Sequence, residues 1–183
     1  MYKERNDLPF LVLKKLVEQN LTLSVAESCT GGLFSKLITD LSGASAAFIG
    51  GIVAYNNSVK ENLLQVSSQT LLTDGAVSSK CAAQMSLGLK KIMNADITVS
   101  FTGIAGPTSG TSEKSIGLVY SHIIFNNKHY PFKFNFQGDR ESIREGAALR
   151  VFQELLKLLK EDEKRVNPLL NKEDIGFSYS NIE

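Results

Sequence analysis

The sequence has little of what would indicate a disulfide-stabilised, metal-binding or membrane-spanning protein. It holds two cysteines, Cys29 and Cys81, without a CxxC pair or a histidine-rich tract. This excludes a disulfide scaffold and a zinc ribbon, and it fits a reducing cytosol. No apolar run approaches the ~20 residues of a membrane span. The charged residues 1–7 do not resemble a signal peptide. We therefore expect a cytoplasmic protein.

An excess of charge of one sign is also lacking. Lysine and arginine number 20, aspartate and glutamate 19, and the net charge is +1. This balance gives no reason to expect nucleic acid or an anionic membrane as a partner, so any phosphate must be recognised locally. Hydrophobic residues make up 43% of the 183 residues, enough for one folded domain. We assign residues 1–160 to that domain and residues 161–183 to a charged, weakly patterned tail.

Hydrophobic periodicity predicts alternating helices and strands. The predicted helices are 8–20, 30–41, a short one after Ser58, an amphipathic element within 65–74, 79–93 and 140–160. The predicted strands are 21–26, 48–55, 96–101, and a hairpin of 116–125 and 129–136. This order predicts an α/β fold, a three-layer α/β/α sandwich around a mixed, mostly parallel sheet with an antiparallel hairpin.

Local signals refine three of these elements. Ser58, with Glu61 three residues later, has the form of a capping box, and Ser78 is placed to cap the helix 79–93. Gly50 and Gly51 lie inside a predicted strand. Glycines there usually mark a bend or the close approach of another backbone.

The segment 25–32 joins a buried strand to a helix through Glu27, Ser28, Cys29, Thr30 and two glycines. Such a junction gathers free backbone N–H groups and the positive end of a helix dipole, which favours an anion. From the residues alone, Ser28 is either a nucleophile or a helix cap, and Thr30 can be both cap and ligand.

Two more polar strand ends follow this one. Tyr55 ends the second predicted strand shortly before Lys60, and the loop 102–106 ends the third. Ligands collect at the carboxyl ends of strands in such sheets. The three strand ends are therefore predicted to line one crevice.

Five motifs occur in a characteristic order. They are Ala26-Glu27-Ser28-Cys29-Thr30-Gly31-Gly32, Tyr55-Asn56-Asn57-Ser58-Val59-Lys60, Gly75-Ala76-Val77-Ser78, Thr102-Gly103-Ile104-Ala105-Gly106-Pro107 and Gly138-Asp139-Arg140. Together they resemble the CinA C-terminal domain family over about residues 8–160. The characterised members of that family are nicotinamide-nucleotide amidases, also called NMN deamidases.

The resemblance implies hydrolysis of nicotinamide mononucleotide to nicotinate mononucleotide and ammonia in pyridine-nucleotide salvage for NAD metabolism. It places the family's serine nucleophile on Ser28 and its lysine partner on Lys60. It also implies a homodimer or higher homo-oligomer and the stand-alone form of the family. We expect no cofactor, and no spacing of carboxylates and histidines suggests a metal. The chain departs from the family pattern in the loop 108–115, where a Gly-Gly start and a Lys-Pro pair are common.

Amide hydrolysis by serine needs a neighbouring base and donors for the developing oxyanion. Lys60 must be neutral to act as this base, and lowering its pKa from ~10.4 to ~7–8 costs about 4 kcal/mol. We therefore predict a desolvated Lys60. Backbone N–H groups around Cys29 to Gly32, the glycines Gly31 and Gly32 among them, are the expected donors, and Thr30, Gly31 and Gly32 would also hold the phosphate or ribose. Since consecutive strand residues point to opposite faces, Ser28 should face the crevice and Cys29 should not.

The remaining candidates would bind the substrate. Arg140 stands at a helix start and would hold a phosphate, unless it is solvated or paired with Glu141 or Glu145. Tyr55 would stack on or hydrogen-bond the nucleotide, or it is simply half-buried. Glu27 would orient Lys60 or hold the amide.

The loop residues Thr102, Gly103 and Gly106 resemble a phosphate or ribose loop. His122 and His129 lie on the hairpin without a catalytic partner in the sequence, and we interpret both as structural.

Two other functions remain open at this stage. One is a nucleotide-binding module without turnover in a competence or DNA-repair pathway, for which Lys60 would be dispensable. The other is an amidase for a different nucleotide-like amide, which the altered loop 108–115 would permit.

Overall fold

The computed structural model describes residues 8–108 and 114–166. Along the chain the elements are α1 (Leu8–Glu18), β1 (Leu23–Glu27), α2 (Leu33–Thr39), the 3-10 turn η1 (Ala44–Ala46), β2 (Phe48–Val53), α3 (Asn57–Asn62), α4 (Ser68–Thr73), α5 (Ser79–Met93), β3 (Ile97–Gly103), β4 (Leu118–Phe125), β5 (Lys128–Asn135) and α6 (Arg140–Val166).

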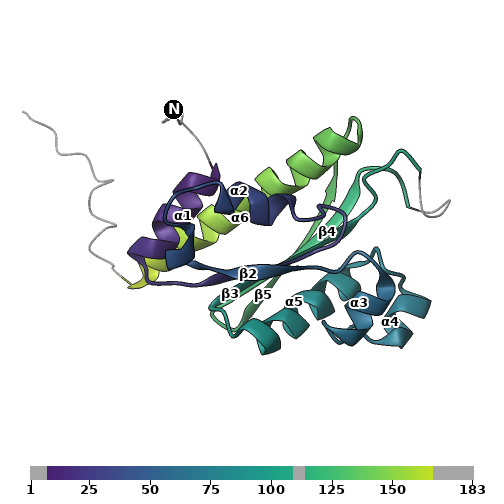
Figure 1. Ribbon diagram of the computed structural model, residues 1–183, viewed down its shortest axis with the longest axis horizontal. Helices are drawn as coiled ribbons and strands as arrows, with labels where there is room; N and C mark the ends of the chain where they lie inside the picture. Colours follow the sequence, from purple (N-terminus) through teal and green to yellow (C-terminus); the bar gives the residue numbers. More distant parts are fainter. Residues whose placement is uncertain (1–7, 109–113, 167–183) are drawn as a thin grey trace, which may run out of the picture.

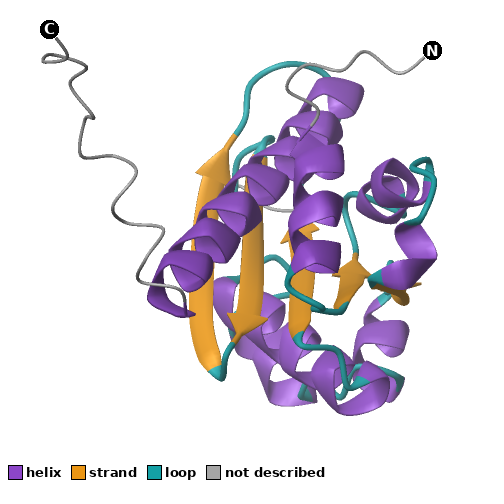
Figure 2. Ribbon diagram, turned by 90° about the vertical axis from the view of Figure 1, so that its left-hand side faces the viewer, coloured by secondary structure: helices purple, strands orange, loops and turns teal. Residues whose placement is uncertain are grey.

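The five strands form one mixed sheet in the order β2-β1-β3-β4-β5. Strand β1 pairs in parallel with β2 and β3, while β3, β4 and β5 pair antiparallel. Helices α1, α2 and α6 cover one face of the sheet, and α3, α4 and α5 lie on the other (Figures 1 and 2). The predicted α/β/α architecture with three parallel strands and an antiparallel hairpin is confirmed.

The larger hydrophobic core lies between the sheet and the layer of α1, α2 and α6. Phe34 of α2 stacks on Phe152 of α6 with ring centroids 3.9 Å apart, and it contacts Phe101 of β3 at 5.3 Å. The apolar residues that recur at helical spacing along α6 are buried in this core: Ile143, Ala147, Val151 and Leu155. A smaller cluster around Met85 and Leu89 of α5 fills the opposite face.

Helix α2 begins at Leu33 rather than at the predicted residue 30. Gly31 and Gly32 adopt positive φ angles of 58° and 94°, which glycine takes up at no steric cost. Because these left-handed conformations are not helical, the helix starts only after Gly32. The residues after Ser28 therefore form a separate turn beside the sheet.

Helix α6 continues to Val166, past the predicted end near residue 160. Ion pairs stabilise its last turns, with Arg165 bonded to Asp162 and Glu163 to Lys15 of α1. The first residues of the predicted tail are thus helical. Residues 167–183 lie outside the described part of the chain.

The predicted capping box at Ser58 is wrong. The cap of α3 is Asn56, whose side-chain oxygen accepts hydrogen bonds from the backbone N–H and the hydroxyl of Ser58. The predicted cap of α5 is confirmed, because Ser78 accepts from the N–H of Cys81. At α3 the carboxamide of Asn56, two residues before Ser58, takes the capping position, since an Asx turn lets it accept from the N–H two residues further on.

The glycine pair of β2 marks a close approach, as predicted. A Cβ on Gly51 would lie 2.7 Å from the hydroxyl of Ser35 and 2.9 Å from the side chain of Val25. The missing side chain lets α2 pack directly over β1 and β2. In the described ranges 8–108 and 114–166, no helix is both long and apolar enough to cross a membrane.

Candidate active site

The carboxyl ends of the three parallel strands meet around one pocket of about 230 Å³. Ser28 follows β1, Tyr55 follows β2, and Thr102 and Gly103 end β3. The lining residues are Ser28, Cys29, Tyr55, Asn57, Lys60, Ala76, Val77, Thr102, Gly103, Ala105 and Arg140. The predicted convergence of three polar strand ends is therefore confirmed.

Ser28 and Lys60 are hydrogen-bonded at the bottom of this pocket. Their Oγ and Nζ atoms lie 3.1 Å apart, and the residues are 9% and 1% exposed. Nζ also donates to the backbone carbonyls of Ala54 at 2.8 Å and Tyr55 at 3.2 Å. The prediction that Lys60 is desolvated is confirmed.

The neighbours of Lys60 suit a neutral amine. Burial lowers the pKa of Lys60, because the charged form loses its hydration. A neutral amine has two N–H bonds and one lone pair. With the two N–H groups on the carbonyls of Ala54 and Tyr55, the lone pair is left to accept the hydroxyl proton of Ser28. This is the arrangement of a general base and its nucleophile.

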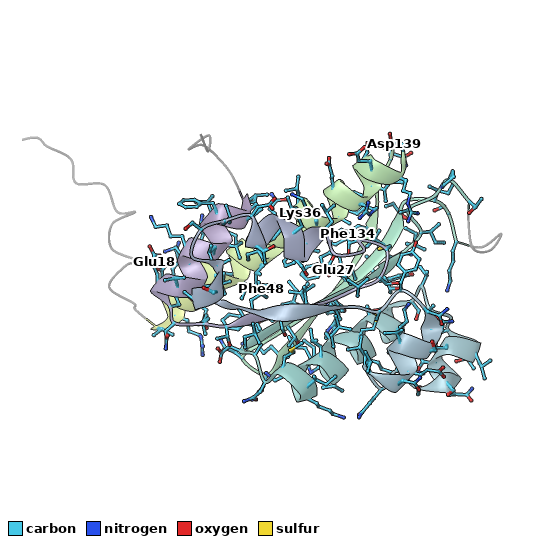
Figure 3. The ribbon with its side chains drawn as sticks, in the orientation of Figure 1. Glu18, Glu27, Lys36, Phe48, Phe134 and Asp139 are labelled. Atoms are coloured by element: carbon cyan, nitrogen blue, oxygen red, sulfur yellow. The ribbon has the colours of Figure 1, made fainter. Side chains whose placement is uncertain are left out.

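Glu27 caps the helix that follows it. Its fully buried carboxylate accepts from the N–H groups of Gly32, Phe34 and Ser35 and from the Ser35 hydroxyl, at 2.7–3.1 Å. In Figure 3 it lies under α2, above the sheet. Glu27 is not among the residues that line the pocket. The structure therefore gives it the capping position that the sequence left open between Ser28 and Thr30.

The turn 28–32 leaves only some of the backbone donors expected between Cys29 and Gly32. The N–H of Gly31 donates to the carbonyl of Ser28, and that of Gly32 donates to Glu27. The expectation that these glycines present free N–H groups is therefore wrong. Within the described residues, the N–H groups of Cys29 and Thr30 donate to no oxygen atom. Both contact the Cys29 sulfur and oppose the rise of its pKa, and they are the turn's candidate donors for a ligand oxygen.

Cys29 borders the pocket beside Ser28, contrary to the prediction that only Ser28 would face it. The residue nevertheless belongs to the hydrophobic core, and burial raises the pKa of its thiol to about 12. A thiol of that pKa is scarcely ionised near neutral pH. Of the two, Ser28 is the one hydrogen-bonded to Lys60.

Thr30 is buried behind the pocket lining rather than in it. Its carbonyl accepts from Nη2 of Arg144 at 2.6 Å and from Nε at 3.2 Å. Its hydroxyl has no hydrogen-bond partner among the described residues. The contact with Arg144 ties the turn after Ser28 to α6, and nothing in the sequence indicated it.

Arg140, the first residue of α6, reaches across the pocket mouth. Its guanidinium donates to the carbonyl of Gly106 at 2.7 Å and to the hydroxyl of Tyr55 at 2.9 Å. It forms no ion pair with Glu141 or Glu145 in the described part of the chain. The remaining N–H groups of a pocket-lining guanidinium can bind an anion.

Tyr55 is 60% exposed, so its ring lies open at the edge of the pocket. Gly103 lines the pocket, whereas Gly106 contributes its carbonyl to Arg140 and does not line it. The hydroxyl of Thr102 donates to the carbonyl of Ala76 at 2.6 Å. Contact of these residues with a substrate stays a prediction.

Four lining residues were missed by the sequence reasoning: Asn57, Ala76, Val77 and Ala105. Each lies inside one of the five ordered motifs. That membership was the available signal, because alanine and valine carry no chemistry of their own.

The hairpin histidines lie away from this pocket lining. Nδ1 of His122 is 2.6 Å from the hydroxyl of Ser86, and Nε2 is 3.3 Å from Nδ1 of His129. Burial lowers the pKa of His122 to about 4, so the ring is neutral near pH 7. This chain of polar groups links α5 to the hairpin, in keeping with a structural role. Across the described residues, no group of three or more His, Cys, Asp or Glu side chains is placed to hold a metal ion.

Residues 5–159 match the family described as the CinA C-terminal domain. The chain is similar to CinA-like proteins of Thermotoga maritima, with 47% identity over 154 residues, and of Geotalea uraniireducens, with 50% identity over 127 residues. These matches cover 84% and 69% of this chain but 38% and 30% of the relatives. The chain thus spans well under half the length of these relatives.

Solved structures of similar proteins share the fold along their whole length. A CinA superfamily protein from Klebsiella pneumoniae is 30% identical with a TM-score of 0.83, and the competence/damage inducible protein CihA from Agrobacterium tumefaciens is 34% identical with a TM-score of 0.80. Each match covers 86% of this chain and 99% of the other.

Proposed function

The chain belongs to the family of CinA C-terminal domains, and from this membership and the pocket geometry we propose that it is a nicotinamide-nucleotide amidase. The reaction is hydrolysis of the carboxamide of nicotinamide mononucleotide to nicotinate mononucleotide and ammonia. The observation that carries the proposal is the buried Lys60 amine, 3.1 Å from the Ser28 hydroxyl and bonded to two backbone carbonyls.

In the proposed mechanism, Ser28 Oγ attacks the carboxamide carbon while Lys60 takes the hydroxyl proton. The tetrahedral intermediate collapses with loss of the C–N bond, and Lys60 returns the proton to the departing nitrogen, which leaves as ammonia. Water then attacks the acyl-enzyme, Lys60 accepts its proton, and Ser28 leaves with that proton. Over the cycle one water is consumed and Lys60 is regenerated as a neutral amine.

The oxyanion of the tetrahedral intermediate needs preorganised donors. The N–H groups of Cys29 and Thr30 fill this role in the proposal, since the turn uses those of Gly31 and Gly32 internally. Thr30 is held in place by Arg144, and the start of α2 is held by Glu27. Such fixed donors require no reorganisation as negative charge develops.

Arg140 would bind the phosphate, with Tyr55 holding one edge of its guanidinium. The apolar wall of Ala76, Val77 and Ala105 would contact the nicotinamide ring. A neutral lysine base, an open pocket mouth with one arginine and an apolar wall together favour a small anionic amide as substrate.

The test is ammonia release by the purified protein from a panel of amides: nicotinamide mononucleotide, nicotinamide riboside, free nicotinamide, and the side-chain amides asparagine and glutamine. We expect the mononucleotide to give the highest kcat/KM. Binding of the mononucleotide without ammonia release would instead identify a nucleotide-binding module. Preferred release from another nucleotide-like amide would reassign the substrate.

A further inference from the structure

The loop between α4 and α5 forms one wall of the pocket, and a lysine from another part of the chain holds it. Lys114 precedes β4, and its Nζ donates to the carbonyls of Asp74 at 2.8 Å and Val77 at 2.6 Å. We propose that Lys114 is a positioning residue that sets the shape of the substrate pocket through the loop 74–78.

The loop has few other attachments. Its Ala76 carbonyl accepts from the Thr102 hydroxyl at 2.6 Å, and the Ser78 hydroxyl donates to the Gly75 carbonyl at 2.8 Å. The second bond lies within the loop itself. The side chains from outside the loop that bond its carbonyls are therefore Thr102 in the middle and Lys114 on both sides of it.

The position of Lys114 depends on a glycine in this loop. Gly75 has a φ of +82°, and a Cβ at this residue would lie 3.1 Å from Nζ of Lys114. A side chain there would be strained by the backbone and would crowd the lysine. This gives a physical reason for the glycine of the Gly75-Ala76-Val77-Ser78 motif, in which the sequence indicated a role only for Ser78, as the cap of the helix that follows.

The bonds of Lys114 bear directly on the pocket lining. Ala76 and Val77 line the pocket together with Lys60, and the carbonyl that Lys114 holds is that of Val77 itself. Asp74 ends α4, so its carbonyl belongs to the negative end of a helix, where a cation is favoured. Without Lys114, two carbonyls lose a charged donor, and the wall carrying Ala76 and Val77 is free to shift.

The proposal predicts a separation of binding from chemistry. Among the described residues, Lys114 makes its hydrogen bonds to Asp74 and Val77 and none to Ser28 or Lys60, so its loss should weaken substrate binding more than it slows the chemical step. A misplaced binding wall raises KM, whereas a lost transition-state contact lowers kcat. The kinetic part of the inference rests on the proposed amidase function, while the positioning of the loop does not.

The experiment compares Lys114→Met, Lys114→Arg and Lys80→Met. Lys80 is the matched control, because it is 56% exposed and binds the side chain of the same Asp74 without reaching the loop carbonyls. We expect Lys114→Met to raise KM about tenfold or more with kcat changed less than about threefold, and Lys114→Arg to recover most of the loss. Lys80→Met should match the wild type.

Amide hydrogen exchange supplies a readout without turnover. In Lys114→Met, exchange at residues 75–78 should accelerate while the amides of β1 and β3 remain protected, which also verifies that the variant is folded; Lys114→Gln replaces it if it is not. Unchanged exchange at 75–78, or faster exchange with wild-type KM, overturns the proposal. If the wild type releases no ammonia, the amidase proposal fails, and the exchange comparison alone then decides whether Lys114 holds the loop.

Discussion

Nζ of Lys60 lies 3.1 Å from Oγ of Ser28 and is bonded to two main-chain carbonyls of the segment that follows β2. In the neutral amine that the proposed mechanism requires, these carbonyls would accept its two N–H groups and leave its lone pair to the Ser28 hydroxyl. The residues come from different elements, since Ser28 follows β1 and Lys60 belongs to α3. The parallel pairing of β1 and β2 brings them together.

Single substitutions should distinguish the role of Ser28 from that of the neighbouring Cys29. Ser28→Ala is expected to lower kcat by about 10⁴-fold or more, because the nucleophile of a paired catalytic unit is removed. Cys29→Ala should keep kcat within about tenfold of the wild type, since it deletes one buried thiol, whereas Lys60 is hydrogen-bonded to Ser28, Ala54 and Tyr55. Ammonia release measures both. Full activity in Ser28→Ala would remove the mechanism.

The pH dependence of catalysis should report the protonation of the Lys60 amine. Burial lowers the pKa of Lys60 below its ordinary value of 10.5, and the base must be unprotonated in the free enzyme. We expect kcat/KM to rise with pH and to level off above an apparent pKa that is lower than 10.5. Lys60→Arg should abolish turnover, because arginine stays protonated throughout this range. An arginine variant with the same pH profile as the wild type would exclude Lys60 as the base.

The pH dependence of folding stability should also reflect the lowered pKa of Lys60. Between the lowered folded-state pKa and 10.5, the unfolded chain binds more protons at Lys60 than the folded protein does. Stability therefore rises with pH in this window, by up to about 1.4 kcal/mol per pH unit from this group. Lys60→Met lacks the contribution, so the wild type should gain stability relative to it as pH increases. Urea unfolding of both proteins from neutral pH to pH 10 measures the difference. Parallel curves would contradict a lowered pKa.

Glu27 should matter for stability rather than for substrate affinity. Glu27→Gln replaces an acceptor of four hydrogen bonds with an amide whose N–H groups face other donors, and we expect a loss of about 2 kcal/mol or more. Denaturant unfolding measures the loss, and KM for the mononucleotide is the second readout. A stable variant with a raised KM would return Glu27 to the substrate-binding role considered from the sequence.

The proposed contact between Arg140 and the substrate phosphate can be tested by removing either the arginine or the phosphate. Arg140→Met should raise KM for nicotinamide mononucleotide by about 10–100-fold, the value of one or two charge-assisted hydrogen bonds. For nicotinamide riboside, which has no phosphate, the same variant should behave like the wild type. An equal loss with both substrates would show that Arg140 acts through Tyr55 and Gly106 instead.

The fold could be predicted from the sequence because short stretches of residues determine most of its helices and strands. Apolar residues recur at helical spacing along α6, and aromatic residues alternate along β5 on the side that packs against the core. Even the serine cap of α5 follows from one residue beside a helical pattern. The misjudged element ends, at α2 and α6, depended on glycine conformations and on ion pairs to distant residues, which a local pattern does not contain.

For the site, the sequence determined which chemical groups stand at the strand ends, and the order of motifs indicated the family. Only the tertiary structure decided how those groups are used. Glu27, rather than Ser28 or Thr30, caps α2, and the N–H groups of Gly31 and Gly32 donate to acceptors within the same segment. The reason is that a hydrogen bond between residues far apart depends on sheet register and on helix packing, and these are properties of the whole fold. The burial of Lys60, on which the proposed chemistry depends, is of the same kind.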